Sequence, residues 1–171
     1  MNAIKKAEQS CIKYQKNQLR MINCASFVAL FREGWKADKI IERFNDATDI
    51  WRECKEKKTS TFALLEEETG IELALDGEKS YTDFEQLRFH TGTYTPEKYI
   101  YSLHRRKRWV APMILSCLAL ALRRVDGWTD EKLEEFLRIT DEIRKTCGED
   151  VRNYINLMVD ETGYTPKLWG E

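Results

Sequence analysis

Residues 24–78 read CASFVALFREGWKADKIIERFNDATDIWRECKEKKTSTFALLEEETGIELALDGE, and residues 117–171 repeat much of this stretch. After a shift of 93 positions the two stretches share 15 identical residues in 55 ungapped pairs, where average composition gives about 3. The matches include two cysteine pairs, a Gly-Trp dipeptide and a Glu-Thr-Gly run: Cys24/Cys117, Cys54/Cys147, Gly34-Trp35/Gly127-Trp128 and Glu68-Thr69-Gly70/Glu161-Thr162-Gly163. We therefore predict an internal duplication, because a repeat of this length sets the architecture of the whole chain.

The composition favours a helical chain that can bury a core. Of 171 residues, 42% are apolar and 33% charged, which is enough apolar surface for one domain. The chain has only 8 Gly and 3 Pro, and this low content favours helices over a loop-rich or sheet-rich fold. The net charge of -1 gives no general attraction to nucleic acid or to an anionic membrane, so such binding needs a local patch. The polar, Lys-rich first twenty residues are unlike a secretory leader, and we expect a cytoplasmic protein.

Apolar residues at helical spacing predict an all-α fold. Each repeat reads as a long helix, a Gly-Trp turn, an amphipathic helix, a short helix and a glycine stop. The expected helices span residues 2–32, 37–56, 59–70, 95–124, 130–147 and 151–162. The second of these is expected to turn one face inward: Ile40, Phe44, Ala47, Trp51 and Cys54. The apolar segment 109–122 is too short for a bilayer, which takes about 20 residues, so we expect no membrane partner.

The expected architecture is an internally duplicated helical bundle in which two three-helix units are related by a pseudo-two-fold axis. The units cover residues 1–78 and 94–171, and a linker covers residues 79–93. Each unit has too few apolar residues to cover its own core. We therefore expect the two long helices to pack against each other, so that both units form one compact domain.

Five cysteines are an odd number, and no CxxC spacing occurs. Four of them occupy matched helical positions among apolar neighbours, which is typical of buried thiols in a reducing compartment. A zinc site built from these four stays open as an alternative, although zinc ligands usually come in clustered pairs. We assign no metal site and no cofactor.

The strongest charged feature is a run of cations with two aromatic residues one or two helical turns earlier. Its members are Arg105, Arg106, Lys107 and Arg108, with Tyr99 and Tyr101 before them. Such residues can contact phosphates and stack on bases, but on a helix they surround the axis. We rank a solvated, partner-facing surface ahead of nucleic-acid binding. Arg123 and Arg124 follow at the far end of the same helix, where the first repeat has apolar residues, so the two copies are expected to do different jobs.

Acidic residues give two further hypotheses. Glu66, Glu67, Glu72 and Asp76 form an acidic patch that could dock on a basic surface. A second set lies at i, i+3, i+7 and i+10 of one helix: Asp46, Asp49, Glu53 and Glu56. Paired carboxylates of this kind hold Mg²⁺ in all-α nucleotide pyrophosphohydrolases, although a charge-rich helix also produces them by chance.

The sequence shows no nucleophile–base arrangement and no glycine-rich phosphate loop. We therefore expect a non-catalytic protein that docks on a macromolecular partner and blocks or organises it, with a protein or nucleoprotein partner first. In type the chain resembles small accessory proteins of bacterial mobile elements, including phage inhibitors of host defence nucleases (anti-CRISPR-like proteins). The alternatives are a nucleic-acid-binding phage or bacterial regulator that uses the basic helix, and an Mg²⁺-dependent pyrophosphohydrolase.

Overall fold

The computed structural model describes residues 2–73 and 95–166, and every regular element in these ranges is an α-helix. The helices are α1 (Ala3–Arg32), α2 (Ala37–Lys57), α3 (Thr61–Thr69), α5 (Pro96–Asp126), α6 (Asp130–Cys147) and α7 (Val151–Thr162). The predicted all-α fold is therefore confirmed for the described part of the chain. The predicted linker 79–93 lies outside the described residues.

Local sequence signals account for the helix boundaries. The side chains of Ser60, Thr95 and Thr129 each accept a hydrogen bond from a backbone N–H in the first turn of α3, α5 and α6. α3 and α7 end at Gly70 and Gly163, whose positive φ values of 74° and 68° suit glycine. These glycine stops were predicted from the repeated Glu-Thr-Gly run.

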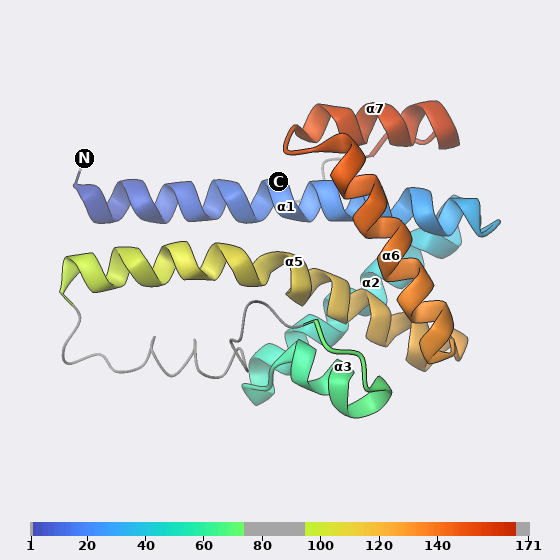
Figure 1. The fold of residues 1–171 in the computed structure, drawn as a ribbon, viewed down its shortest axis with the longest axis horizontal. Coiled ribbons are helices and arrows are strands. Elements are labelled where there is room, and N and C mark those ends of the chain that lie inside the picture. Colours follow the sequence, from blue (N-terminus) through green and yellow to red (C-terminus); the bar gives the residue numbers. More distant parts are fainter. Residues whose placement is uncertain (1, 74–94, 167–171) are drawn as a thin grey trace.

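The two long helices pack against each other, as expected, and they run in parallel (Figure 1). The Tyr99 hydroxyl of α5 donates a hydrogen bond to the Glu8 carboxylate of α1 over 2.9 Å. One turn further along, the Cys11 thiol lies 3.7 Å from the Leu103 carbonyl oxygen. Pairs about 92 residues apart therefore meet near the start of both helices, and the two helices run in the same direction.

The shorter helices cross over to the long helix of the other half of the chain. α2 and α3 pack mainly on α5, whereas α6 and α7 pack mainly on α1. Two ion pairs join these elements: Arg32 of α1 donates to Glu161 over 2.9 Å, and Arg124 of α5 donates to Glu68 over 3.2 Å. The hydrogen bond from Arg32 lowers the pKa of Glu161 below its usual value. Each half therefore completes its core with helices from the other half.

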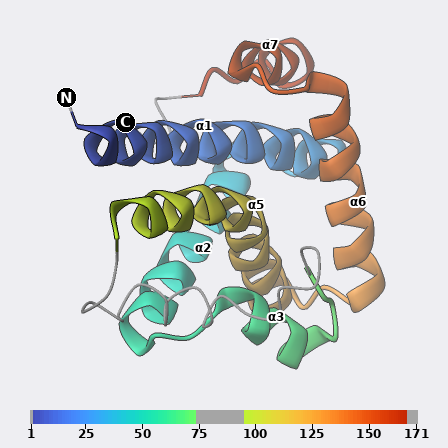
Figure 2. The same cartoon turned by 60° about the vertical axis from the view of Figure 1, so that its left-hand side comes forward.

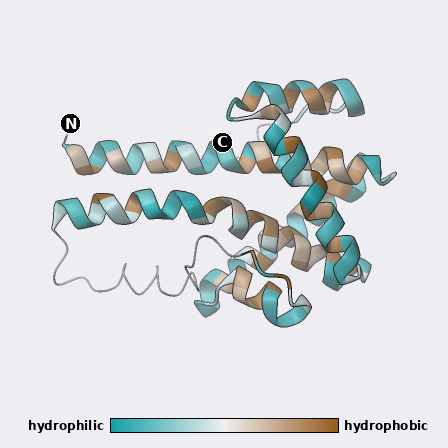
Figure 3. Ribbon diagram, in the orientation of Figure 1, coloured by the Kyte–Doolittle hydropathy of each residue, from teal (hydrophilic) through white to brown (hydrophobic). Residues whose placement is uncertain are grey.

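The core lies in the C-terminal halves of α1 and α5, where hydrophobic residues are concentrated (Figure 3). Almost every residue from 24 to 30 and from 117 to 122 is fully buried. The expected inner face of α2 lies against this core, but its residues differ in burial. Ile40, Ile50 and Cys54 are buried together with Arg43, while the predicted residues Phe44, Ala47 and Trp51 are only half-buried.

The two Gly-Trp turns meet at one end of this core. The rings of Trp35 and Trp128 lie 5.7 Å apart in an edge-to-face arrangement, with 84° between their planes. A lysine amine caps each ring: Lys39 lies 3.6 Å from the Trp35 centroid, and Lys132 lies 4.4 Å from the Trp128 centroid. The turns thus act as structural stops that contact each other, which agrees with the interpretation from the sequence.

A buried ion pair joins α2 to the end of α5. Arg43 Nε lies 2.6 Å from an Asp126 oxygen, and the two side chains are only 8% and 12% exposed. Asp46 lies on the other side of the guanidinium group at 2.5 Å. A buried charge is costly without partners, and the carboxylates of Asp126 and Asp46 offset this cost for the Arg43 guanidinium.

We expect Asp126→Ala to lower the free energy of unfolding by about 3 kcal/mol, because it leaves the Arg43 guanidinium buried with one partner removed. Urea unfolding followed by circular dichroism measures this loss. Asp49→Ala is the matched control, since it breaks an exposed pair with Arg52 and is expected to cost less than about 1 kcal/mol. Equal losses in the two variants would contradict a stabilising role for the Arg43–Asp126 pair.

Candidate functional site

The N-terminal halves of α1 and α5, residues 3–20 and 96–110, form an arm whose far end extends beyond the shorter helices in Figure 1. Figure 2 shows the two helices of the arm side by side, with α7 above them and α2 below. Where the arm joins the core, Trp109 stacks on Phe62 of α3 and Gln18 accepts a hydrogen bond from Arg144 of α6. The arm is thinly packed compared with the core. Its buried side chains are Cys11, Gln18, Leu103, Trp109 and Val110. The other described residues of the arm are exposed or half-buried.

The arm carries a strong positive charge in a chain that is close to neutral. It contains ten Lys or Arg residues and two carboxylates, Glu8 and Glu97, which gives a formal charge of +8 with histidine neutral. The whole chain has a net charge of -1, so the remaining residues carry -9. Charges of one sign gathered on a projecting surface create a local field that the net charge hides.

One stripe of α5 combines cations with an exposed aromatic ring. Lys98, Tyr101, Arg105 and Arg108 lie at i, i+3, i+7 and i+10, and His104 lies beside them. Tyr101 is 65% exposed, the largest exposure of any large apolar or aromatic side chain in the described residues. We call these five residues the α5 basic face. It is able to contact phosphates and to offer a ring for stacking.

The other predicted members of the basic cluster lie in different surroundings. Tyr99 turns its hydroxyl to Glu8 on α1 and does not lie on the α5 basic face. Lys107 donates to the Ser10 hydroxyl over 3.1 Å, and its amine lies 5.5 Å from the Tyr14 ring. Arg106 is half-buried, and so is Arg105 of the α5 basic face. The cluster thus surrounds the helix, as the sequence predicted, and only part of it faces outward.

Arg123 and Arg124 belong to the other end of α5 and do not join the arm. Arg123 donates to the Trp128 carbonyl oxygen over 2.7 Å and pairs with Asp130 at 3.1 Å. Arg124 pairs with Glu68 of α3. Both arginines therefore make contacts that join parts of the fold.

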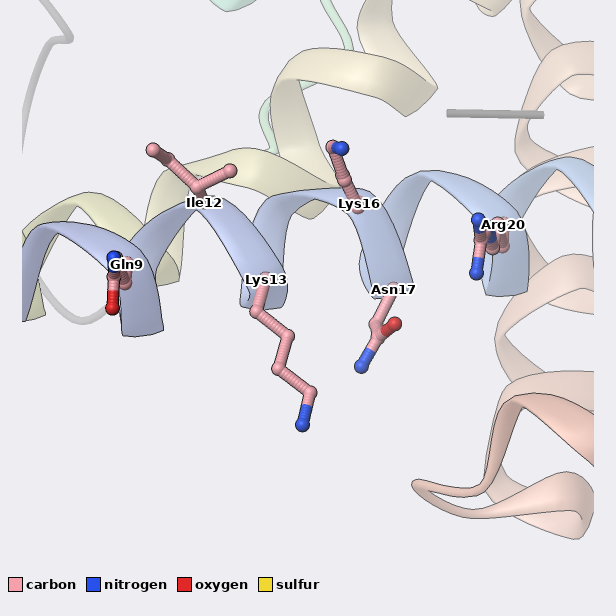
Figure 4. A pocket seen from close by; sticks show the side chains of 6 residues that line it. All are labelled: Gln9, Ile12, Lys13, Lys16, Asn17 and Arg20. Atoms are coloured by element: carbon pink, nitrogen blue, oxygen red, sulfur yellow. The ribbon is translucent and has the colours of Figure 1, made fainter. Parts of the chain in front are cut away.

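Sequence reasoning missed a second basic surface, on α1. It comprises Lys5, Gln9, Lys13, Lys16, Asn17 and Arg20, which we call the α1 basic face. All of these residues except Lys5 line a shallow open depression of about 380 Å³, together with Ile12 (Figure 4). The signal that could have revealed it is the i, i+4, i+8, i+11 and i+15 spacing of cationic and amide side chains.

The two predicted sets of acidic residues differ in their contacts. Glu66, Glu67 and Glu72 are exposed, while Asp76 lies outside the described residues. In the carboxylate stripe of α2, Asp46 pairs with Arg43, Asp49 with Arg52 and Glu53 with Lys57. Within residues 2–73 and 95–166 no group of three or more His, Cys, Asp or Glu residues could hold a metal ion.

All five cysteines are buried free thiols. Burial raises the pKa of Cys24 and of Cys117 to about 12. A neighbouring thiol raises the pKa further in each case: Cys147 of α6 acts on Cys24, and Cys54 of α2 acts on Cys117. At neutral pH these side chains are apolar core residues and not thiolate nucleophiles.

Comparison with protein family models, with curated proteins and with solved structures gives no match to this chain. Of the helices described, none is long and apolar enough to cross a membrane. The candidate site therefore rests on the geometry and charge of the arm.

We expect the free energy of unfolding to fall as the pH rises above 9 toward 12. The unfolded chain releases the two thiol protons above the usual cysteine pKa of 9.0, whereas the folded protein keeps them until about 12. Each thiol should contribute a slope of about 1 kcal/mol per pH unit in this window. Urea unfolding under reductant at pH 8, 9 and 10 measures the slope. The variant Cys24→Ala/Cys117→Ala should lose less stability over the same range, and an unchanged slope would contradict the assignment.

Proposed function

We propose that the chain is a non-catalytic binding protein whose basic arm binds the phosphate backbone of nucleic acid. The observation that carries this proposal is the separation of charge: +8 on the arm and -9 on the rest of the chain. A cationic surface releases condensed counterions when it meets a nucleic-acid backbone, and this release supplies much of the binding free energy.

The α5 basic face supplies the first contact surface of the arm. Lys98 and Arg108 lie about three turns apart on one stripe and are both exposed. Tyr101 lies between them with 65% of its surface exposed. An exposed ring between cations suits single-stranded nucleic acid, because an unpaired base can stack on the ring while the backbone meets the cations.

The acidic remainder of the chain favours one mode of approach. A polyanion that comes near α6 or the end of α3 meets exposed carboxylates, among them Glu66 and Glu67. It is therefore repelled from that part of the molecule and directed to the arm. The charge separation orients the complex as well as stabilising it.

We expect Lys98→Ala/Arg108→Ala to raise the Kd for a 30-nucleotide single-stranded DNA about tenfold at 100 mM NaCl and to reduce the slope of log K against log salt by about 1 to 1.5. Tyr101→Ala should weaken binding of the single strand by a similar factor and leave binding of a 30-bp duplex nearly unchanged, because only the unpaired bases can stack. Fluorescence anisotropy over a salt series measures both effects.

The matched control removes two cations from the acidic part of the molecule. Arg138→Ala/Lys145→Ala changes the net charge equally, but these exposed α6 side chains pair with Glu135 and Asp141. This variant should bind with nearly wild-type affinity. Equal weakening by both double variants would show a non-specific charge effect, and the absence of any salt-dependent binding would overturn the proposal.

A second candidate function is protein docking through the acidic surface, as in a phage inhibitor of a host defence nuclease. The exposed Glu66, Glu67 and Glu72 and the charge of -9 outside the arm favour it. Such a surface complements the basic nucleic-acid channel of a nuclease and could block it. In this case the complex would survive nuclease treatment and would be held by carboxylates.

If this second function holds, we expect the tagged protein to retain a bacterial nuclease from nuclease-treated lysate. The variant Glu66→Lys/Glu67→Lys should not retain this nuclease, because the charge complementarity is reversed. Mass spectrometry of the bound fraction and inhibition of the purified nuclease measure this. Glu131→Lys/Glu134→Lys, on exposed positions of α6, is the control. A nuclease that stays bound to the charge-reversed variant would exclude this docking surface.

We further propose that the chain is an internal duplication with pseudo-two-fold symmetry, in which each half exchanges its shorter helices. Three observations support it: the parallel α1–α5 pair, the Trp35–Trp128 contact between matched residues, and the ion pairs of the matched acids Glu68 and Glu161 with the opposite long helix. The buried thiols suit a reducing compartment, so we place the protein in the cytoplasm.

A further inference from the structure

The α1 basic face lies along one side of its helix and is long enough to follow a nucleic-acid backbone. Lys5, Gln9, Lys13, Lys16 and Arg20 are separated by four, four, three and four residues, which places them on a single stripe. At 1.5 Å per residue the stripe is about 22 Å long. It therefore covers a surface comparable to about six base pairs of duplex.

This face points away from α5. α1 meets α5 through Cys11, which is buried against Leu103, and through Ser10, which accepts a hydrogen bond from Lys107. In Figure 4 the labelled α1 side chains lie along their helix with the α5 ribbon behind it. The two basic faces are thus on opposite sides of the arm.

The α1 basic face contains cations and amides and no carboxylate. Lys5, Lys13 and Lys16 are exposed. Glu8 is the one acid in this half of the helix, and it accepts a hydrogen bond from Tyr99 on the opposite side. The amides of Gln9 and Asn17 line the same depression. Cations with interspersed amide donors match a phosphodiester backbone, whose oxygens accept from both.

We propose that the α1 basic face binds a second segment of nucleic acid, so that a single molecule bridges two segments held on opposite sides of its arm. This inference rests on the proposed function of the α5 basic face. It assigns the α1 stripe a role of its own, because one backbone that contacts the α5 basic face cannot also follow the far side of α1 along its length.

Two polyanions can lie on the two faces without strong mutual repulsion. Packed helices have axes about 8–10 Å apart, and each helix with its side chains is about 10–12 Å wide, so the two faces are about 20 Å apart. The Debye length at physiological salt is about 8 Å. The charge of +8 on the arm also lies between the two backbones. Bridging is therefore electrostatically feasible.

The test uses the full-length protein, a biotinylated 30-bp duplex on beads and a fluorescent 30-bp duplex in solution. We expect the wild-type protein to retain the fluorescent duplex on the beads. Lys5→Ala/Lys13→Ala/Lys16→Ala should reduce this retention at least tenfold but change the Kd for a single duplex by no more than a few-fold. Sedimentation velocity of the complex should show two duplexes on one wild-type protein and one duplex on the α1 variant.

Each outcome decides a separate point. If the wild-type protein binds one duplex and captures no second, or if the triple variant bridges as well as the wild type, the bridging inference is wrong and the proposed function stands. If no duplex or single strand binds, the proposed function itself fails. If the triple variant loses retention of an acidic protein but behaves as wild type toward nucleic acid, the α1 basic face serves a protein partner and the inference is also overturned.

Discussion

The parallel packing of α1 against α5 is the contact on which the rest of the structure depends. The C-terminal halves of both helices are apolar on nearly every side, and their residues from 24 to 30 and from 117 to 122 are almost completely buried. Neither helix can cover such a surface with the two short helices that follow it in sequence. Burying both at once removes a large apolar area from water, which is the main favourable term in folding.

The crossed arrangement of the shorter helices follows from this pairing. Once α1 and α5 share a core, α2 and α3 reach the open side of α5, while α6 and α7 reach the open side of α1. The Glu68–Arg124 and Glu161–Arg32 pairs join the outer helices to those positions. Each half therefore contributes part of the other's core.

Much of this fold could be predicted from the sequence because its signals are local. Caps such as Thr95 and stops such as Gly163 act within one helical turn, and the predicted helix bounds agree with the structure to within a few residues. The crossing could not be predicted in this way, because periodicity shows that a face is buried but not which helix buries it. The inward turn of Arg43 was missed for a related reason: its partner Asp126 is 83 residues away, and hydropathy alone assigns arginine to the surface.

For the same reason, only part of the charged surface could be recognised from the sequence. The basic run near Arg108 was visible because its members are adjacent in sequence, whereas Lys5, Lys13 and Lys16 are spread over the start of the chain. Only the parallel α1–α5 contact places the two sets on one arm. That arm has few buried residues, so its cations can change with little effect on the core. The apolar core and the charged arm occupy different parts of the same two helices, so the stability of the core depends little on which charges the arm carries.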